Sequence, residues 1–297
     1  HRHFRRQRQM CIRDSSKVYV EDLKKEFIND FVYPMMQSSA IYEGTYLLGT
    51  SIARPLIAKR QIEIANKEKA FAVSHGSTGK GNDQVRFELA FHALNPKIEI
   101  ISPWRIWNYK SREDCIEYAK KNKIPITVTK QKPYSCDRNI FHVSYEGGIL
   151  EDPWVEPPDS MFETVRPLSK SLNKPTKITL SFKNGVPVRL NGKRIDGVNL
   201  FNKLNKLAGS HGIGVVDIVE NRFVGMKSRG VYETPGGTVL NIAHRAVESL
   251  TMDREVMHIR DSLIPKISQL IYNGFWFSPE MRVLLSFIKE SQKNITG

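Results

Sequence analysis

The chain has 297 residues, which is enough to bury one large core or two ordinary ones. It is 40% hydrophobic and 26% charged, and no apolar run is long enough to cross a bilayer, so the sequence indicates no membrane partner. The net charge is +14, but the positive charges outside the first sixteen residues are spread out, which is typical of a solvated surface and argues against a nucleic-acid partner.

The first sixteen residues, HRHFRRQRQMCIRDSS, differ in composition from the rest of the chain. They show no periodicity and no apolar segment of a secretion signal. We expect a non-native leader at 1–16; a basic RNA-binding arm is the competing interpretation. Cys11, Cys115 and Cys136 show neither CxxC spacing nor an even framework, which predicts a reducing, cytoplasmic location.

From residue 17 to 123, predicted helices alternate with predicted strands. The helices are expected at 18–31, at about 52–67, at 83–94 and from the near-capping box at 111–114 to about 122. The second should begin near Pro55 with Ser51 as its N-cap. The strands are expected at 69–74 and 97–101, with a turn at 42–44. This order predicts an α/β fold, a doubly wound parallel sheet with its site at the carboxyl ends of the strands.

Residues 124–297 have a different character and predict a second domain of the α+β class. Proline and glycine become frequent, and Asn184-Gly185 and Asn191-Gly192 predict hairpins. A helix is expected at 198–207, a strand at 213–220 and three helical stretches after Thr238. The predicted domains are therefore 17–123, for nucleotide binding, and 124–297, for the substrate.

The stretch SHGSTGKGNDQVRFE, 74–88, lies between a predicted strand and a predicted helix. It is not a Walker A loop, because Ser74 stands where that motif has glycine and Gly81 stands where it has a hydroxyl. A helix N-terminus after a glycine loop presents free N–H groups that suit an anion. An ordinary turn with glycines at positive φ is the alternative. The density of polar side chains favours a binding site.

Three further segments are also dense in polar residues: 42–55, then 132–139 with 144–148, and 220–237. Each residue alone has an ordinary interpretation, such as a turn hydroxyl or a weak surface ion pair. The sequence shows no Ser/His/Asp or Cys/His set and no His/Cys cluster with metal-ligand spacing. Cys136 has no neighbouring base, so we do not expect it to be a nucleophile.

Together, four motifs resemble the argininosuccinate synthase family, in that family's order: YEGTYLLGTSIARP, SHGSTGKGNDQVRFE, a serine pair nine residues apart, and VENRFVGMKSRGVYETPGG. The resemblance covers 18–297. It implies an ATP-dependent C–N ligase of arginine biosynthesis or nitrogen disposal. This ligase joins citrulline to aspartate through a citrulline adenylate and releases AMP and pyrophosphate.

The resemblance also implies the roles of eleven residues. ATP would be bound by Gly76. Aspartate would be bound by Thr78, Asn82 and Asp83. Citrulline would be bound by Tyr46, Ser51, Asn82, Arg86, Ser135, Ser144, Glu220 and Tyr232. Arginine suits a carboxylate and glutamate an ammonium, while hydroxyls suit a neutral ureido group. The resemblance further implies ATP with Mg²⁺ as substrate and a homotetramer, and it offers no evident acid or base and no protein-bound metal.

The chain departs from the family pattern in three ways. It contains no Ser-Gly-Gly-x-Asp pyrophosphate loop, it lacks the family's C-terminal tail, and Asp137-Arg138-Asn139 has arginine where the family usually has an acidic residue. We therefore expect a truncated chain with poor ATP binding and little ligase activity. A non-catalytic amino-acid-binding homologue and a related tRNA-modifying adenylating enzyme are the alternatives.

Overall fold

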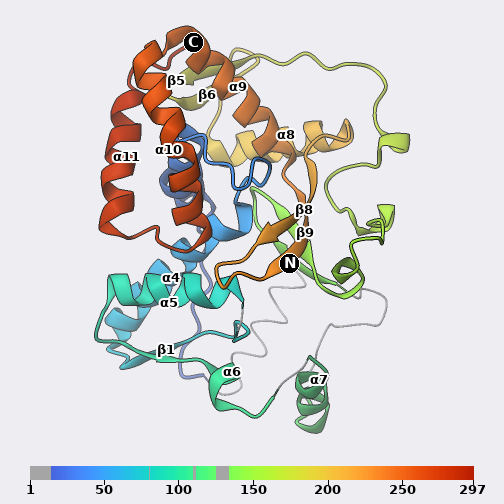
Figure 1. The fold of residues 1–297 in the computed structure, drawn as a ribbon, viewed down its shortest axis with the longest axis vertical. Helices are drawn as coiled ribbons and strands as arrows, with labels where there is room; N and C mark the ends of the chain where they lie inside the picture. The colour runs from blue at the N-terminus through green and yellow to red at the C-terminus, as the bar shows by residue number, and fades with distance from the viewer. Residues whose placement is uncertain (1–14, 80, 110–111, 125–133) are drawn as a thin grey trace.

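A computed structural model describes residues 15–79, 81–109, 112–124 and 134–297. The helices of the first part are α2 (Lys24–Glu26), the π-helical turn η1 (Phe27–Val32), α3 (Tyr33–Gln37), α4 (Gly49–Glu68), α5 (Asn82–Leu94), α6 (Pro103–Ile106) and α7 (Arg112–Lys121). Strands β1 (Ala72–Ser74) and β2 (Glu99–Ile101) pair in parallel. The predicted parallel α/β arrangement is confirmed, with shorter strands than expected (Figure 1).

The second part contains two antiparallel sheets and four long helices. One sheet has the order β3-β4-β9-β8, formed by Ser135–Arg138, Val143–Glu146, Lys227–Glu233 and Val215–Asn221. The other is β5-β6-β7, formed by Leu180–Lys183, Val186–Leu190 and Lys193–Arg194. The helices are α8 (Gly197–Ser210), α9 (Pro235–Thr251), α10 (Arg254–Tyr272) and α11 (Pro279–Ser291); short 3-10 turns η2, η3 and η4 occupy Gly148–Glu151, Asp159–Met161 and Leu168–Lys170. Both predicted hairpins are confirmed, because Asn184-Gly185 and Asn191-Gly192 all have positive φ.

The first helix was predicted too early in the chain. Helical structure begins at Lys24 rather than at residue 18 and continues to Gln37. The segment before it runs as non-helical chain along α4, where Tyr19 and Lys17 both contact Glu68. These side-chain contacts hold the segment on the neighbouring helix, so local helix propensity does not decide its conformation.

The start of α4 was also predicted wrongly. The helix begins at Gly49, so Ser51 is buried inside its first turn instead of capping it. A Cβ at Gly49 would overlap the side chain of His142, and this close approach places the helix start. Pro55 is tolerated in the second turn, although it cannot donate a hydrogen bond.

The buried face of α5 is partly polar. Val85 and Leu89 are only partly buried, and His92 is exposed. The buried side chains are Gln84, Arg86, Ala90 and Phe91. A buried polar pair at the start of the helix is not what a hydrophobic pattern predicts, and it marks the part of α5 that faces the site.

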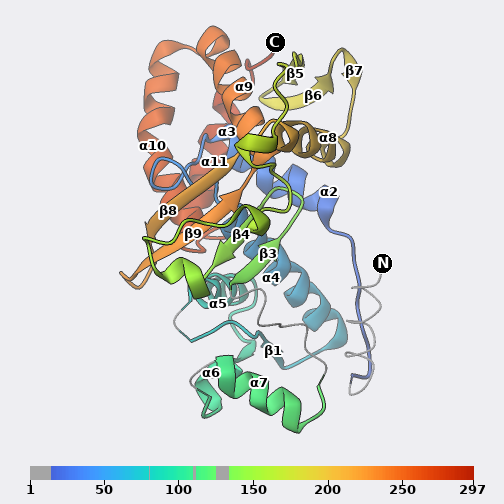
Figure 2. The same cartoon turned by 90° about the vertical axis from the view of Figure 1, so that its right-hand side faces the viewer.

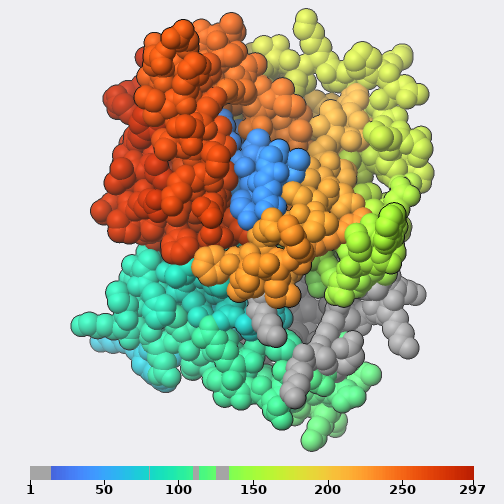
Figure 3. Space-filling view, viewed as in Figure 1, coloured from blue at the N-terminus to red at the C-terminus, as the bar shows by residue number. Residues whose placement is uncertain are grey.

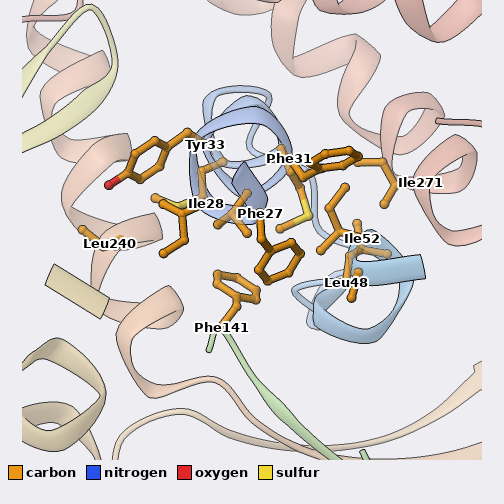
Figure 4. Close-up of a cluster of buried hydrophobic side chains, with 14 of the residues drawn as sticks. Phe27, Ile28, Phe31, Tyr33, Leu48, Ile52, Phe141, Leu240 and Ile271 are labelled. Atoms are coloured by element: carbon orange, nitrogen blue, oxygen red, sulfur yellow. The ribbon is translucent and has the colours of Figure 1, made fainter. Parts of the chain in front are cut away.

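The main hydrophobic core joins segments from both ends of the chain. Figure 4 shows Phe27, Ile28 and Phe31 of the first helix packed near Leu48, Ile52, Phe141 and Ile271. A smaller cluster packs the later part of α4 and α5 against β1. The first helix thus belongs to the same core as α9, α10 and α11, although the sequence assigned it to the nucleotide-binding domain. The domain boundaries at 17–123 and 124–297 stay a prediction.

A buried ion pair fixes α9 to α10 beside this core. Arg260 and Glu248 are both 0% exposed, and the guanidinium donates to both carboxylate oxygens at 2.6 Å. Arg260 also donates to Ser39 Oγ at 2.8 Å, while Gln292 donates to Glu248 at 2.8 Å. The pair therefore connects the end of α3, α9, α10 and the segment after α11.

We expect Arg260→Met to destabilise the chain by about 3–5 kcal/mol, because it leaves the Glu248 carboxylate buried without its partner. Chemical denaturation measures this loss. The double variant Arg260→Met with Glu248→Leu should be more stable than the single variant, because no uncompensated charge remains. A double variant less stable than Arg260→Met would contradict this account.

Candidate functional site

A cavity of about 370 Å³ lies where the glycine loop and the start of α5 meet the four-stranded sheet. Nine of the eleven predicted site residues line it: Tyr46, Gly76, Thr78, Asn82, Asp83, Arg86, Ser135, Glu220 and Tyr232. The other two, Ser51 and Ser144, are buried. Figure 2 shows the sheet above α4 and α5. A larger hollow of about 930 Å³ lies along the loop after α3, α9 and α10 and contains none of the predicted residues.

The alternation of the strands brings six polar side chains to one face of the sheet. Residues paired across strands, and every second residue along a strand, share a face. Ser135 pairs with Glu146, and Ser144 pairs with both Asp137 and Tyr232. The six residues are Ser135, Asp137, Ser144, Glu146, Glu220 and Tyr232. This register explains why serines nine residues apart in sequence belong to one site.

The carboxylate of Asp83 is held between two arginines. Arg54 of α4 donates to Asp83 Oδ2 from Nε at 2.9 Å and from Nη2 at 2.6 Å, and Arg86 donates to Oδ1 at 2.9 Å. Arg54 also reaches Asp137 on β3 at 2.6 Å. Although burial raises the pKa of Asp83, the two guanidinium groups outweigh it and lower the pKa, so the carboxylate is ionised.

Aromatic rings form the wall beneath the sheet face. Tyr46 stacks on Tyr232 with ring centroids 4.3 Å apart. His142 also stacks on Tyr232, with ring centroids 5.4 Å apart. Burial lowers the pKa of His142 to about 3, so the imidazole is neutral. Its Nε2 lies 2.7 Å from Thr50 Oγ1, which fixes the ring. His142 thereby supports the two tyrosines without carrying charge.

Three buried polar atoms at the site have no hydrogen-bond partner among the described residues: Ser51 Oγ, Ser144 Oγ and Glu220 Oε2. An unsatisfied buried polar group is costly, and in a native protein it often marks a ligand site. The other oxygen of Glu220 accepts from Tyr232 at 3.0 Å. Burial raises the pKa of Glu220 to about 7, and the hydrogen bond from Tyr232 and the charge of Arg86 offset this effect only in part.

The glycine loop is not explained by backbone strain. Gly76, Gly79 and Gly81 all lack positive φ, which removes the ordinary-turn explanation for them. A Cβ at Gly76 would meet nothing within 4 Å, so this position faces open space on the cavity side. Gly81 is the N-cap of α5 and offers no side chain to the first N–H groups of the helix. These N–H groups stay available to an anion.

The β8–β9 hairpin reaches over the start of α5. The amide of Phe223, at its tip, donates to Asn82 Oδ1 at 3.0 Å, and Asn82 Nδ2 donates to the hydroxyl of Tyr272 at 2.8 Å. Tyr42 donates to the carbonyl of Asn221 at 2.8 Å. Figure 3 shows the loop after α3, in blue, beside this orange hairpin. Two distant segments therefore fix the orientation of Asn82, and Tyr42 holds the hairpin in place.

Sequence reasoning missed several residues of the site. Thr50, Ser77, Gly81, Asp137, Glu146 and Arg222 also line the cavity. Most lie inside or next to the polar segments already singled out, so density of polar residues could have found them. For His142, directly before β4, the sequence carries no such signal, because a single histidine between apolar residues is more often a core residue.

No group of three or more His, Cys, Asp or Glu within the described ranges could hold a metal ion. Across the same ranges, every helix is too short or too polar to cross a membrane.

Comparison with known proteins identifies relatives over most of the chain. The "Arginosuccinate synthase N-terminal HUP domain" matches residues 2–125, and the "Arginosuccinate synthase C-terminal domain" matches residues 134–297. The chain is 61% identical over 285 residues to the argininosuccinate synthase of Syntrophus aciditrophicus, covering 95% of this chain and 71% of that protein. It is 60% identical over 281 residues to that of Syntrophobacter fumaroxidans, covering 95% and 70%.

The pKa of Glu220 predicts how stability depends on pH. Because its folded pKa, about 7, exceeds the ordinary 4.5, the protonated folded form is favoured, and stability falls as the pH rises towards and through 7. Between about pH 5 and about pH 8 this group alone should remove about 2–3 kcal/mol from the free energy of unfolding. Denaturation of Glu220→Gln should show a pH dependence weaker by that amount; equal slopes would contradict the assignment.

Proposed function

The chain belongs to the argininosuccinate synthase family, and we propose that the cavity binds citrulline and aspartate for ATP-dependent ligation. Members of this family are C–N ligases that use ATP as a substrate and form argininosuccinate. Citrulline is activated as its adenylate, pyrophosphate leaves, and the amine of aspartate then displaces AMP. We also propose a role in this reaction for individual residues of the cavity.

The observation that carries the proposal is the match between the buried, unpartnered groups and citrulline. Citrulline has an ammonium, a carboxylate and a neutral ureido group. Glu220 Oε2 would accept from the ammonium, Arg86 would donate to the carboxylate, and the hydroxyls of Ser51 and Ser144 would meet the ureido group. Hydrogen bonds to such a ligand would offset the free-energy cost of leaving these buried polar groups without partners.

The glycine loop and the start of α5 would bind aspartate and the phosphates of ATP. Thr78 and Asn82 suit a carboxylate, and the ionised Asp83 suits the ammonium. Gly76 would let phosphate oxygens approach the backbone, and the free N–H groups of α5 would add an attractive field. Mg²⁺ would arrive with ATP, bound by the phosphates rather than by a protein cage.

Catalysis would rest on positioning. Holding the ureido oxygen in line with the α-phosphate, and the amine next to the activated carbon, can lower a barrier by about 7–11 kcal/mol. The stacked tyrosines and the arginine-bracketed Asp83 are rigid supports for such alignment. Backbone N–H groups and Mg²⁺ would stabilise the charge on the phosphoryl group.

The proposal also includes the location of the protein, its assembly and its pathway. Cys115 is a free thiol, which supports a cytoplasmic location. Exposed apolar side chains on α9 and α10, namely Ile242, Leu250 and Ile259, support assembly into a homotetramer. Arginine biosynthesis and nitrogen disposal use the same chemistry, so the site favours neither.

We expect Ser144→Ala to weaken citrulline binding by about tenfold and to leave the stability of the free chain within about 0.5 kcal/mol, since its hydroxyl has no partner in the protein. Calorimetric titration with citrulline and chemical denaturation measure the two effects.

Ser38→Ala is the matched control. Ser38 is also buried, but its hydroxyl donates to the carbonyl of Met35 at 2.6 Å. The control should lose about 1 kcal/mol of stability and keep its citrulline affinity. If Ser144→Ala destabilised the chain and left citrulline binding unchanged, the proposed ureido contact would be wrong.

Pyrophosphate release tests the chemistry itself. We expect release from ATP to require citrulline and not RNA, measured on this chain and on a version extended at its ends to the length of its relatives. Weak release from the 297-residue chain together with full release from the extended version would confirm the poor ATP binding expected from the sequence. A chain that binds citrulline but releases no pyrophosphate in either form would be an amino-acid-binding homologue, and the ligase assignment would fail.

A further inference from the structure

Four carboxylates line the cavity, and each has different neighbours. We therefore expect them to have different chemical roles. Asp83 is bracketed by two arginines, and Asp137 is paired with one of them. Glu220 lies deep in the cavity and accepts from Tyr232. Glu146 lines the cavity with one long contact, from Arg222 Nη2 at 3.3 Å.

We propose that Glu146 accepts the proton that the aspartate ammonium must lose before its nitrogen can attack the citrulline adenylate. The inference rests on the proposed function and adds a group to it, because the family resemblance assigns the role of acid or base to none of its residues. Glu146 faces the same cavity as Asp83, the expected partner of that ammonium.

The position of Glu146 follows from the strand register. It pairs directly with Ser135 on β3 and lies two residues after Ser144 on β4, so all three share the face that borders the cavity. Both serines are expected to contact citrulline. Glu146 therefore borders the expected citrulline site, and it lies close enough to Asp83, the expected partner of the aspartate ammonium, for that charge to raise its pKa.

The charges that face Glu146 give it the properties of a base. Burial raises its pKa, and Asp83 and Asp137 raise it further, whereas Arg222 and Arg86 lower it. The net effect is a raised pKa, opposite to that of Asp83. Two neighbouring carboxyl groups whose pKa values are pushed apart are a common arrangement for dividing a binding role from a proton-transfer role.

Glu146 also lies close enough to Glu220 to raise the pKa of that carboxyl group. Binding of the citrulline ammonium to Glu220 would neutralise that charge. Among the described residues, Glu146 would then be the one cavity carboxylate that is bound neither by citrulline nor by Arg54 or Arg86, so it would be available to the aspartate ammonium.

The proton and electron balance is complete without another reagent. The ammonium gives one proton to the Glu146 carboxylate, and the freed lone pair forms the C–N bond to the ureido carbon. The C–O bond to AMP breaks, and AMP leaves with that electron pair and the second proton of the amine. The guanidinium of the product remains, and Glu146 returns its proton to solvent.

The first test needs no turnover. With citrulline bound, calorimetric titration should show that aspartate affinity rises with pH in the unmodified chain, because Glu146 must be ionised to meet the ammonium. Glu146→Gln should weaken aspartate binding by about 10- to 100-fold and flatten this dependence. Glu156→Gln, at an exposed carboxylate outside the cavity, is the matched control and should change neither.

The second test separates proton transfer from a structural role. In the extended chain, Glu146→Gln should retain citrulline-dependent exchange of pyrophosphate into ATP but slow argininosuccinate formation by about 10²–10⁴-fold, with partial recovery in Glu146→Asp. Equal loss of both activities, or unchanged aspartate affinity and pH dependence, would overturn the inference. Failure of the unmodified chain to bind citrulline would instead reject the proposed function.

Discussion

The site depends on one electrostatic constraint, the Asp83 carboxylate held between Arg54 and Arg86. This arrangement connects α4, α5 and, through Asp137, strand β3, so three segments that are distant in sequence are fixed relative to one another. Buried charges persist only when they are paired, and here each guanidinium and the carboxylate have partners. The cavity opens beside this cluster, and Asp83, Arg86 and Asp137 line it.

The antiparallel sheet supplies the second half of the site by simple geometry. Its register places hydroxyls and carboxylates from β3, β4, β8 and β9 on one face, opposite the glycine loop. The aromatic stack of Tyr46, Tyr232 and a neutral His142 closes the wall behind them. Groups that stay unpartnered on this face, such as Ser144 Oγ, are those that a zwitterionic ligand with a ureido group would satisfy.

Several local predictions failed where a distant segment decided the outcome. Helix α4 begins at Gly49, because only a residue without a side chain fits against His142, which lies 93 positions further along the chain. The first helix begins late because the residues before it are held on Glu68. The buried side of α5 carries Arg86 because the cavity, and not an apolar layer, lies beside it.

The sequence by itself determined the fold class, the two hairpins and the identity of the polar segments, because turns, helix ends and binding motifs depend on neighbouring residues. It also identified eleven candidate residues, nine of which line one cavity. Only the tertiary structure decided which side chains meet and what charge they carry. The raised pKa of Glu220 and the opposite shifts of Asp83 and Glu146 arise from burial and from charges brought together by the fold, and no local pattern records them.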